Sequence, residues 1–183
     1  MNPSPNLFLI GPMGAGKSSI GRRLAERFGL PCIDLDAEIE RRTGASVATI
    51  FEIEGEAGFR RRESDLLAEL TARNAIVLAT GGGAVLAPAN RALLRERGFV
   101  LWLQASVEQQ LQRLARDHKR PLLDAPDRGE RLRQLALARD PVYAELADCR
   151  VGGAGESCEH AAARIAALLE TQWQRKPAVK DNP

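Results

Sequence analysis

The sequence has few of the residues that build metal centres or disulfide frameworks. It contains two histidines, and none of its three cysteines forms a CxxC pair. Two histidines do not supply the ligands of a structural zinc site, and three cysteines cannot all pair with one another. We therefore expect reduced thiols and a cytoplasmic location.

Long hydrophobic runs are also missing. No segment approaches the ~18 consecutive apolar residues of a membrane-spanning helix. The opening MNPSPN lacks the charged start and apolar stretch of a signal peptide. The formal net charge is +2, which is too close to neutral to indicate a nucleic acid or membrane partner by itself. We expect a protein that binds neither.

The 183 residues, 44% of them apolar, suit one domain with a substantial core. Short apolar runs predict strands at 7–10, 32–35, 75–79, 99–103 and 149–151. Helices are predicted between and after the strands, at 18–28, 36–44, 46–51, 56–73, 88–97, 106–116, 130–139 and 157–173. This alternation predicts an α/β fold in three layers, a mostly parallel sheet with helices on both faces.

Three further features complete the expected organisation. One domain spans residues 1–174, residues 117–129 form a mobile surface lid, and residues 175–183 form a disordered tail. In parallel sheets, ligands bind at the carboxyl ends of the strands. The glycine clusters at 11–16 and 81–83 and the two aspartates Asp34 and Asp36 all fall at the carboxyl ends of predicted strands. We expect the functional site where these segments meet.

The stretch GPMGAGKSS, residues 11–19, joins a predicted strand to a predicted helix and matches the phosphate-loop pattern. Glycines allow successive backbone N–H groups to turn inward around an anion, and the following helix adds its positive end. Lys17, one of only four lysines, can reach the outer phosphates, and Ser18 can offer a hydroxyl to Mg²⁺. We conclude that this stretch binds a nucleoside triphosphate.

A phosphate loop alone does not identify the reaction. The Asn-Lys-x-Asp motif of a Ras-like GTPase is missing, and the chain is short for an ATP-driven motor. A small-molecule kinase remains, which needs a basic lid, an acceptor pocket and a carboxylate near the acceptor hydroxyl. On residues alone a gluconate kinase, a nucleoside monophosphate kinase and a catalytically idle nucleotide-binding module all stay open.

Four blocks narrow the choice further. They are GPMGAGKSSIGRRLA, DLDAEIERRTG with IFEIEGEAGFRRRE, TGGGAV, and RPLL followed by ARDPVYAELAD. In this order and spacing the sequence resembles the shikimate kinases. The resemblance implies a P-loop kinase fold with a lid and a monomeric enzyme. Its reaction would transfer the γ-phosphoryl group of ATP to the 3-hydroxyl of shikimate, on the route to chorismate and aromatic amino acids.

The resemblance also implies a nucleotide side of the site. Residues that match the family's ATP-binding positions are Gly14, Ala15, Gly16, Lys17, Ser18, Ser19 and Arg120. Arg120 belongs to the lid and would close over the phosphates together with Lys17 as a catalytic charge. One Mg²⁺ ion would accompany ATP, held by Ser18 directly and by Asp34 through water.

On the acceptor side, Asp36 matches the family's catalytic carboxylate, which orients the acceptor hydroxyl and accepts its proton. Arg60 and Arg139 match arginines that bind the substrate carboxylate, a task suited to a guanidinium fork. The backbone N–H of Gly82 would donate to the substrate. Without the resemblance, the run Arg60–Arg62 would be read as a solvated helix face.

Overall fold

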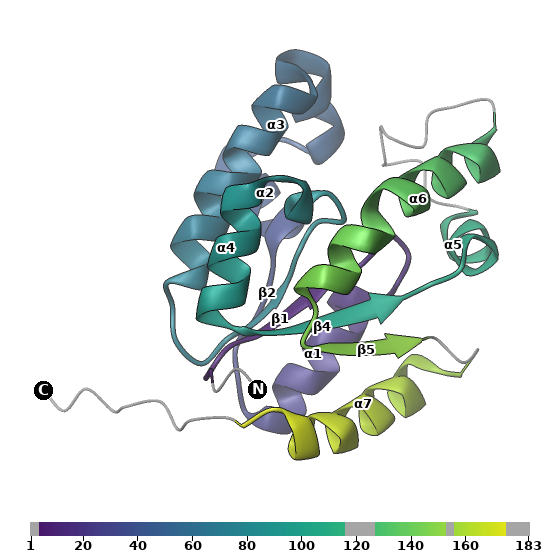
Figure 1. Cartoon of the computed structure of the whole chain (residues 1–183). Helices are drawn as coiled ribbons and strands as arrows, with labels where there is room; N and C mark the ends of the chain where they lie inside the picture. Colours follow the sequence, from purple (N-terminus) through teal and green to yellow (C-terminus); the bar gives the residue numbers. More distant parts are fainter. Residues whose placement is uncertain (1–3, 116–126, 153–155, 175–183) are drawn as a thin grey trace, which may run out of the picture.

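The computed structural model describes residues 4–115, 127–152 and 156–174 (Figure 1). In these residues a five-stranded sheet has the order β2-β3-β1-β4-β5, and every neighbouring pair is parallel. The strands are β1 (Leu7–Ile10), β2 (Cys32–Asp34), β3 (Val77–Ala79), β4 (Phe99–Gln104) and β5 (Cys149–Gly152). All five strands were predicted, and the parallel sheet is confirmed.

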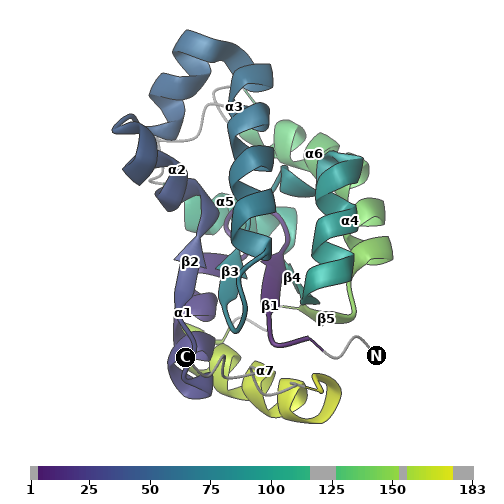
Figure 2. The ribbon, with the colours of Figure 1, turned by 90° about the vertical axis from the view of Figure 1, so that its left-hand side faces the viewer.

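The helices lie near their predicted positions. They are α1 (Lys17–Phe28), α2 (Leu35–Thr43), α3 (Val47–Thr71), α4 (Pro88–Arg97), α5 (Val107–Leu114), α6 (Arg128–Leu146) and α7 (Cys158–Gln172), with a short 3₁₀ turn, η1, at Ala84–Leu86. Helices α1 and α7 cover one face of the sheet, and α3, α4 and α6 cover the other (Figures 1 and 2). The three-layer prediction is therefore confirmed.

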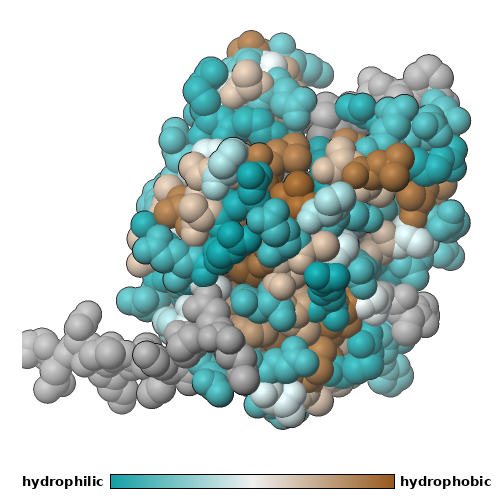
Figure 3. Space-filling model, viewed as in Figure 1, coloured by the Kyte–Doolittle hydropathy of each residue, from teal (hydrophilic) through white to brown (hydrophobic). Residues whose placement is uncertain are grey.

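The central strand β1 shows why the sheet is covered on both sides. Leu7 and Leu9 pack into the core beneath α1 and α7, whereas Phe8 and Ile10 pack into the core on the opposite face. Successive side chains of a strand point to opposite faces, so a strand that is apolar throughout needs two covering layers. Hydrophilic side chains dominate the outer surface seen in Figure 3.

Helix α6 differs most from the prediction. We expected a loop to residue 129 and a helix that ends at Arg139, but α6 begins at Arg128 and continues to Leu146 with Pro141 inside it. A proline inside a helix leaves the carbonyl four residues earlier without its N–H partner. That residue is Leu137, which is 79% exposed and lies on the solvent side. Solvent can satisfy its carbonyl there, so the helix tolerates the proline.

Helix α3 joins two helices that were predicted separately. Its backbone is non-helical at Gly55, with φ 68° and ψ 178°, between the predicted ranges 46–51 and 56–73. Glycine adopts this positive φ at little cost.

Three predicted parts lie outside the described residues. They are residues 117–126 of the lid, the tail at 175–183, and residue 116, the last of the predicted helix 106–116. Within the described ranges, no helix is long and apolar enough to cross a membrane.

Asn6 joins three chain segments at the amino ends of the strands, opposite the predicted site. Its buried side-chain amide donates to the carbonyls of Arg73 and Arg97, at 2.8 and 3.0 Å. Its carbonyl oxygen accepts from the backbone N–H of Ile76 at 3.1 Å. Backbone groups that no ladder hydrogen bond reaches are thereby satisfied.

We predict that Asn6→Ala lowers the free energy of unfolding by about 3 kcal/mol, because it leaves buried backbone groups without hydrogen-bond partners. Urea denaturation measures this change. The exposed Asn74→Ala should leave stability nearly unchanged and serves as the matched control. Equal stability of the two variants would contradict the assigned role of Asn6.

Candidate active site

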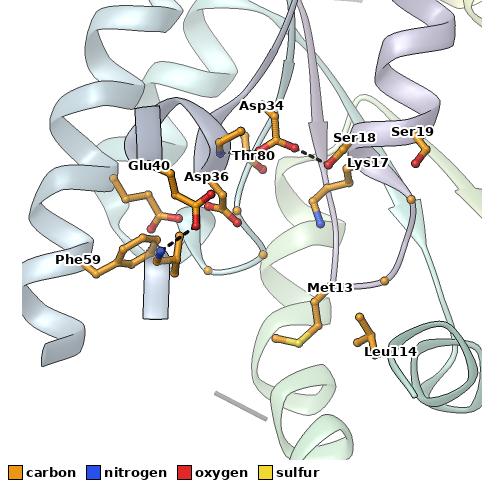
Figure 4. Close-up of a pocket in the computed structure, with 18 of the residues that line it drawn as sticks. Met13, Lys17, Ser18, Ser19, Asp34, Asp36, Glu40, Phe59, Thr80 and Leu114 are labelled. Atoms are coloured by element: carbon orange, nitrogen blue, oxygen red, sulfur yellow. Dashed lines mark hydrogen bonds between the residues drawn. The ribbon is translucent and has the colours of Figure 1, made fainter. Parts of the chain in front are cut away.

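A cavity of about 610 Å³ lies at the carboxyl edge of the sheet. Ten of the residues predicted from the sequence line it: Gly14, Gly16, Lys17, Ser18, Ser19, Asp34, Asp36, Arg60, Gly82 and Arg139. Ala15 lines an adjoining cavity of about 250 Å³, and Arg120 lies outside the described residues. Figure 4 shows side chains of the phosphate loop, α2 and α3 around the larger cavity. The structure thus brings the described candidates together.

The phosphate loop depends on glycine at its first position. Gly11 has φ 136°, and a Cβ there would lie 2.2 Å from the backbone oxygen of Leu103. The loop ends at Gly16, whose left-handed backbone begins α1 without a capping side chain. Of the α-helices in the described residues, α1 alone has neither a capping side chain nor an initial proline. A helix start of this kind suits an anion.

Lys17 lies across this loop. Its buried side chain donates from the ammonium group to the carbonyls of Gly11 and Pro12, both at 2.8 Å. The charge is therefore held beside the amides that would surround a phosphate group. A compact ammonium in this place suits the outer phosphates of a nucleotide.

Ser18 and Asp34 meet at the edge of the same loop. The Ser18 hydroxyl donates to Oδ2 of Asp34, and Oδ1 of Asp34 accepts from the N–H of Ala37 at 3.1 Å. Asp34 therefore caps α2 as well as facing the loop. Hard oxygen donors of this kind suit Mg²⁺, which takes its remaining ligands from phosphates and water. The described residues contain no cluster of three or more His, Cys, Asp or Glu side chains that could hold a metal unaided.

The glycine turn after β3 leaves room for charged side chains. A Cβ at Gly81 would lie 2.5 Å from Oε1 of Glu63 and 2.9 Å from Oδ1 of Asp36. A Cβ at Gly83 would lie 2.3 Å from the Arg60 guanidinium. The absence of side chains in the turn therefore lets carboxylates from α2 and α3 and an arginine from α3 approach its backbone closely.

Gly82 lies between the phosphate loop and Arg139. A Cβ built on it would lie 3.4 Å from the Gly11 oxygen, 3.5 Å from the Met13 nitrogen and 3.6 Å from Nη1 of Arg139. The turn thus borders the nucleotide side and the predicted acceptor side at once. These are ordinary contact distances, so the two sides of the site are adjacent.

The turn's carbonyl groups are all engaged. Those of Gly81 and Gly83 accept from the N–H groups of Ala84 and Leu86, at 3.2 and 3.0 Å. That of Gly82 accepts from the hydroxyl of Tyr143. In the described residues no hydrogen bond uses the N–H groups of the three glycines. These donors therefore remain for a ligand.

The structure separates the three arginines of the run 60–62. Arg60 lines the cavity, whereas Arg61 and Arg62 are exposed and Arg62 pairs with Glu54 at 2.7 Å. Burial works against the charged form of Arg60. Its two carboxylate partners, Glu63 at 2.6 Å and Glu56 at 3.2 Å, nevertheless hold its pKa above the usual value.

Glu63 is a site residue that sequence reasoning missed. Its side chain is 1% exposed, one oxygen bonds Arg60, and Oε1 has no hydrogen-bond partner in the described residues. Burial raises the pKa of this carboxyl, and the nearby Asp36 carboxylate adds to the effect while Arg60 opposes it. The spacing of three residues from Arg60 was a usable signal, but nothing in the sequence indicated burial.

Arg139 differs from Arg60 in its surroundings. It is 4% exposed, and it forms no ion pair with a carboxylate of the described residues. Burial lowers the pKa of its guanidinium, while Tyr143 opposes that shift. A buried guanidinium without a carboxylate is costly unless an anion reaches it, so this position favours an acidic ligand.

The adjoining cavity extends the site beyond the phosphate loop. Arg113 lines both cavities and donates to the carbonyl of Gly14 at 2.9 Å. Gln104 and Arg164 also line the adjoining cavity, and Arg164 pairs with Glu156 at 2.5 Å. Gln104 and Arg164 had been assigned no role from the sequence, which left Arg113 open between a nucleotide contact and a solvated helix residue. A second chamber next to a phosphate loop has room for the nucleoside part of a nucleotide.

Comparison with known proteins gives a consistent result. The family model described as shikimate kinase matches residues 13–170. The shikimate kinase of Stenotrophomonas maltophilia strain K279a is 54% identical over 176 residues, covering 96% of this chain and 98% of that protein. That of Methylococcus capsulatus is 53% identical over 170 residues, covering 93% and 95%. The solved shikimate kinase from Acinetobacter baumannii, in complex with shikimate, has a TM-score of 0.89 and 48% identity, covering 93% and 95%.

We predict that Lys17→Met lowers ADP affinity by roughly 100-fold, because a charge-assisted contact is lost while side-chain length is kept. Isothermal calorimetry measures the affinity. The exposed Arg23→Met loses one positive charge on the same helix and should bind ADP as the native protein does. Unchanged ADP affinity in Lys17→Met would remove this ammonium from the nucleotide site.

Proposed function

The chain belongs to the shikimate kinase family, and from that premise we propose how its own residues carry out the reaction. It is an ATP-dependent kinase that transfers the γ-phosphoryl group of ATP to the 3-hydroxyl of shikimate, which yields shikimate 3-phosphate and ADP. The product lies on the route to chorismate and the aromatic amino acids.

ATP occupies the phosphate loop. The N–H groups from Gly14 to Ser19 surround the phosphates, and Lys17 turns its ammonium from the loop carbonyls to the outer phosphate oxygens. The nucleoside extends into the adjoining cavity beside Arg113. Because the uncapped start of α1 faces the same loop, its dipole favours the negative charge there.

Shikimate occupies the larger cavity with its carboxylate at Arg139 and Arg60 and its hydroxyl toward Asp36. The acceptor oxygen forms a bond to the γ-phosphorus while the bond from that phosphorus to the β–γ bridging oxygen breaks. The hydroxyl proton passes to Asp36, and the electron pair of the broken bond stays with ADP. The protein therefore contributes mainly positioning and charge neutralisation.

The observation that carries this proposal is the contact geometry of Gly82. Its position lies within van der Waals reach of the phosphate loop on one side and of the buried Arg139 on the other. A ligand carboxylate at Arg139 thus places the rest of a small acceptor beside the phosphates. Such proximity is what in-line phosphoryl transfer requires.

Several finer assignments belong to the same proposal. Ser18 and Asp34 would hold Mg²⁺, which when bound neutralises charge on the phosphate oxygens. Arg120 in the lid would add a further positive charge over the transferred group. We also propose a monomer that works in the cytoplasm, in keeping with three cysteines that are all free thiols.

We predict turnover with shikimate and none with gluconate or nucleoside monophosphates in parallel assays of ADP release. A nucleoside monophosphate has no carboxylate for the two arginines, and gluconate is an open chain that does not hold a hydroxyl at a fixed distance from its carboxylate as the ring of shikimate does. Turnover with gluconate but not shikimate would reject the assignment. Binding of ATP with transfer to none of these acceptors would indicate an idle nucleotide-binding module instead.

We further predict that Asp36→Asn lowers kcat by ~100-fold or more, because the amide cannot accept the hydroxyl proton. ADP affinity should stay close to native, since Asp36 lies on the acceptor side of the cavity. Steady-state kinetics and calorimetry measure the two quantities. Asp65→Asn, an exposed acid on α3 that does not line the cavity, is the control. A native kcat in Asp36→Asn would exclude this carboxylate from proton transfer.

A further inference from the structure

Tyr143 is the single tyrosine of the chain and one of its largest fully buried side chains. It lies on α6 one turn after Arg139, so the two side chains share a face of the helix. Its aromatic ring packs on Trp102 of β4, with 5.6 Å between ring centroids. The family resemblance assigned it no role.

The hydroxyl of Tyr143 engages both sides of the acceptor site. It donates a hydrogen bond to the backbone oxygen of Gly82. The Arg139 guanidinium, whose N–H groups can only donate, lies on the same face of α6, and its interaction with the Tyr143 hydroxyl supports the charged form of Arg139 against burial. One hydroxyl can donate once and accept as well, so a single atom links the glycine turn to the buried arginine.

The bond to Gly82 also sets the orientation of a peptide group. In a trans peptide the C=O of one residue and the N–H of the next point in opposite directions. The Tyr143 hydroxyl holds the Gly82 oxygen, so the Gly83 N–H points away from Tyr143. That N–H has no partner in the described residues, and Gly83 lines the larger cavity.

We propose that Tyr143 is a positioning residue. It fixes the Arg139 guanidinium and the Gly82–Gly83 peptide relative to each other, so that both can bind the acceptor carboxylate. This inference rests on the proposed function. Tyr143 does not line the larger cavity, so it would act through Gly82 and Arg139. A residue that only fills the core would make the same ring contacts without needing a hydroxyl.

Tyr143→Phe tests the proposal, because it removes the hydroxyl and keeps the ring against Trp102. The KM for shikimate should rise about tenfold, as the Gly82 oxygen is left buried without a donor and Arg139 loses an acceptor. The KM for ATP should stay within twofold of native, and kcat should fall less than the KM rises. Native KM values for both substrates, or equal changes in both, would overturn the proposal.

The matched control is Trp173→Phe. Trp173 is also a buried aromatic donor to a backbone carbonyl, that of Ser4 at 2.7 Å, but it lies far from the cavity. This variant should lower the melting temperature about as much as Tyr143→Phe does, with both KM values native. A raised shikimate KM in the control would show that lost stability alone explains the effect.

A double-variant cycle tests the route through Arg139. In an Arg139→Lys background, an ammonium group replaces the guanidinium that lies beside the Tyr143 hydroxyl. Tyr143→Phe should then raise the shikimate KM by less than threefold, because part of its effect has already been lost. A full tenfold rise in that background would place the effect elsewhere and contradict the role assigned through Arg139.

The single tyrosine permits a test without substitution. Protein with 3-fluorotyrosine should give one ¹⁹F resonance from position 143, and saturating shikimate should shift it more than saturating ADP does. A resonance that responds to ADP alone, or to neither ligand, would overturn the inference. If the native enzyme fails to phosphorylate shikimate, the proposed function falls with it; normal turnover with an unshifted resonance rejects the inference alone.

Discussion

A short backbone turn without side chains, residues 81–83, is the feature on which the arrangement of the site depends. Charged groups from two helices, α2 and α3, approach this turn more closely than a Cβ would allow at two of its positions. The same turn borders the phosphate loop. Its carbonyls are engaged elsewhere, and its N–H groups have no partner among the described residues, so the turn presents donors where the ligand is expected. The absence of side chains there is therefore a functional requirement.

The two arginines of the acceptor site are balanced differently. Arg60 is paired with Glu63 and Glu56 before any ligand arrives. Arg139 is more deeply buried and has no carboxylate partner in the described residues. Burying an unpaired charge costs several kcal/mol, which a bound carboxylate would partly recover. This asymmetry indicates that the charge of Arg60 is already paired before a ligand binds, whereas the charge of Arg139 becomes paired when an anionic ligand binds.

Stability and ligand binding are located at opposite edges of the sheet. At the amino edge, Asn6 satisfies three backbone groups with one side chain. At the carboxyl edge, no side chain caps the start of α1, and the N–H groups of residues 81–83 have no partner within the part of the chain that the structure describes. Asp34 serves both purposes, since it caps α2 and accepts from Ser18. Unsatisfied backbone groups are thus concentrated where a ligand can satisfy them.

The sequence by itself determined the five strands, the phosphate loop and the family, because these depend on local apolar runs and on fixed spacings of glycine, lysine and serine. It failed where a local rule competes with packing, as at Pro141, after which α6 continues. Only the tertiary structure decided that Arg60 rather than its neighbours lines the cavity and that Glu63 and Tyr143 are buried beside the glycine turn. Burial and mutual approach are set by segments far apart in the chain, and no short stretch of sequence contains them.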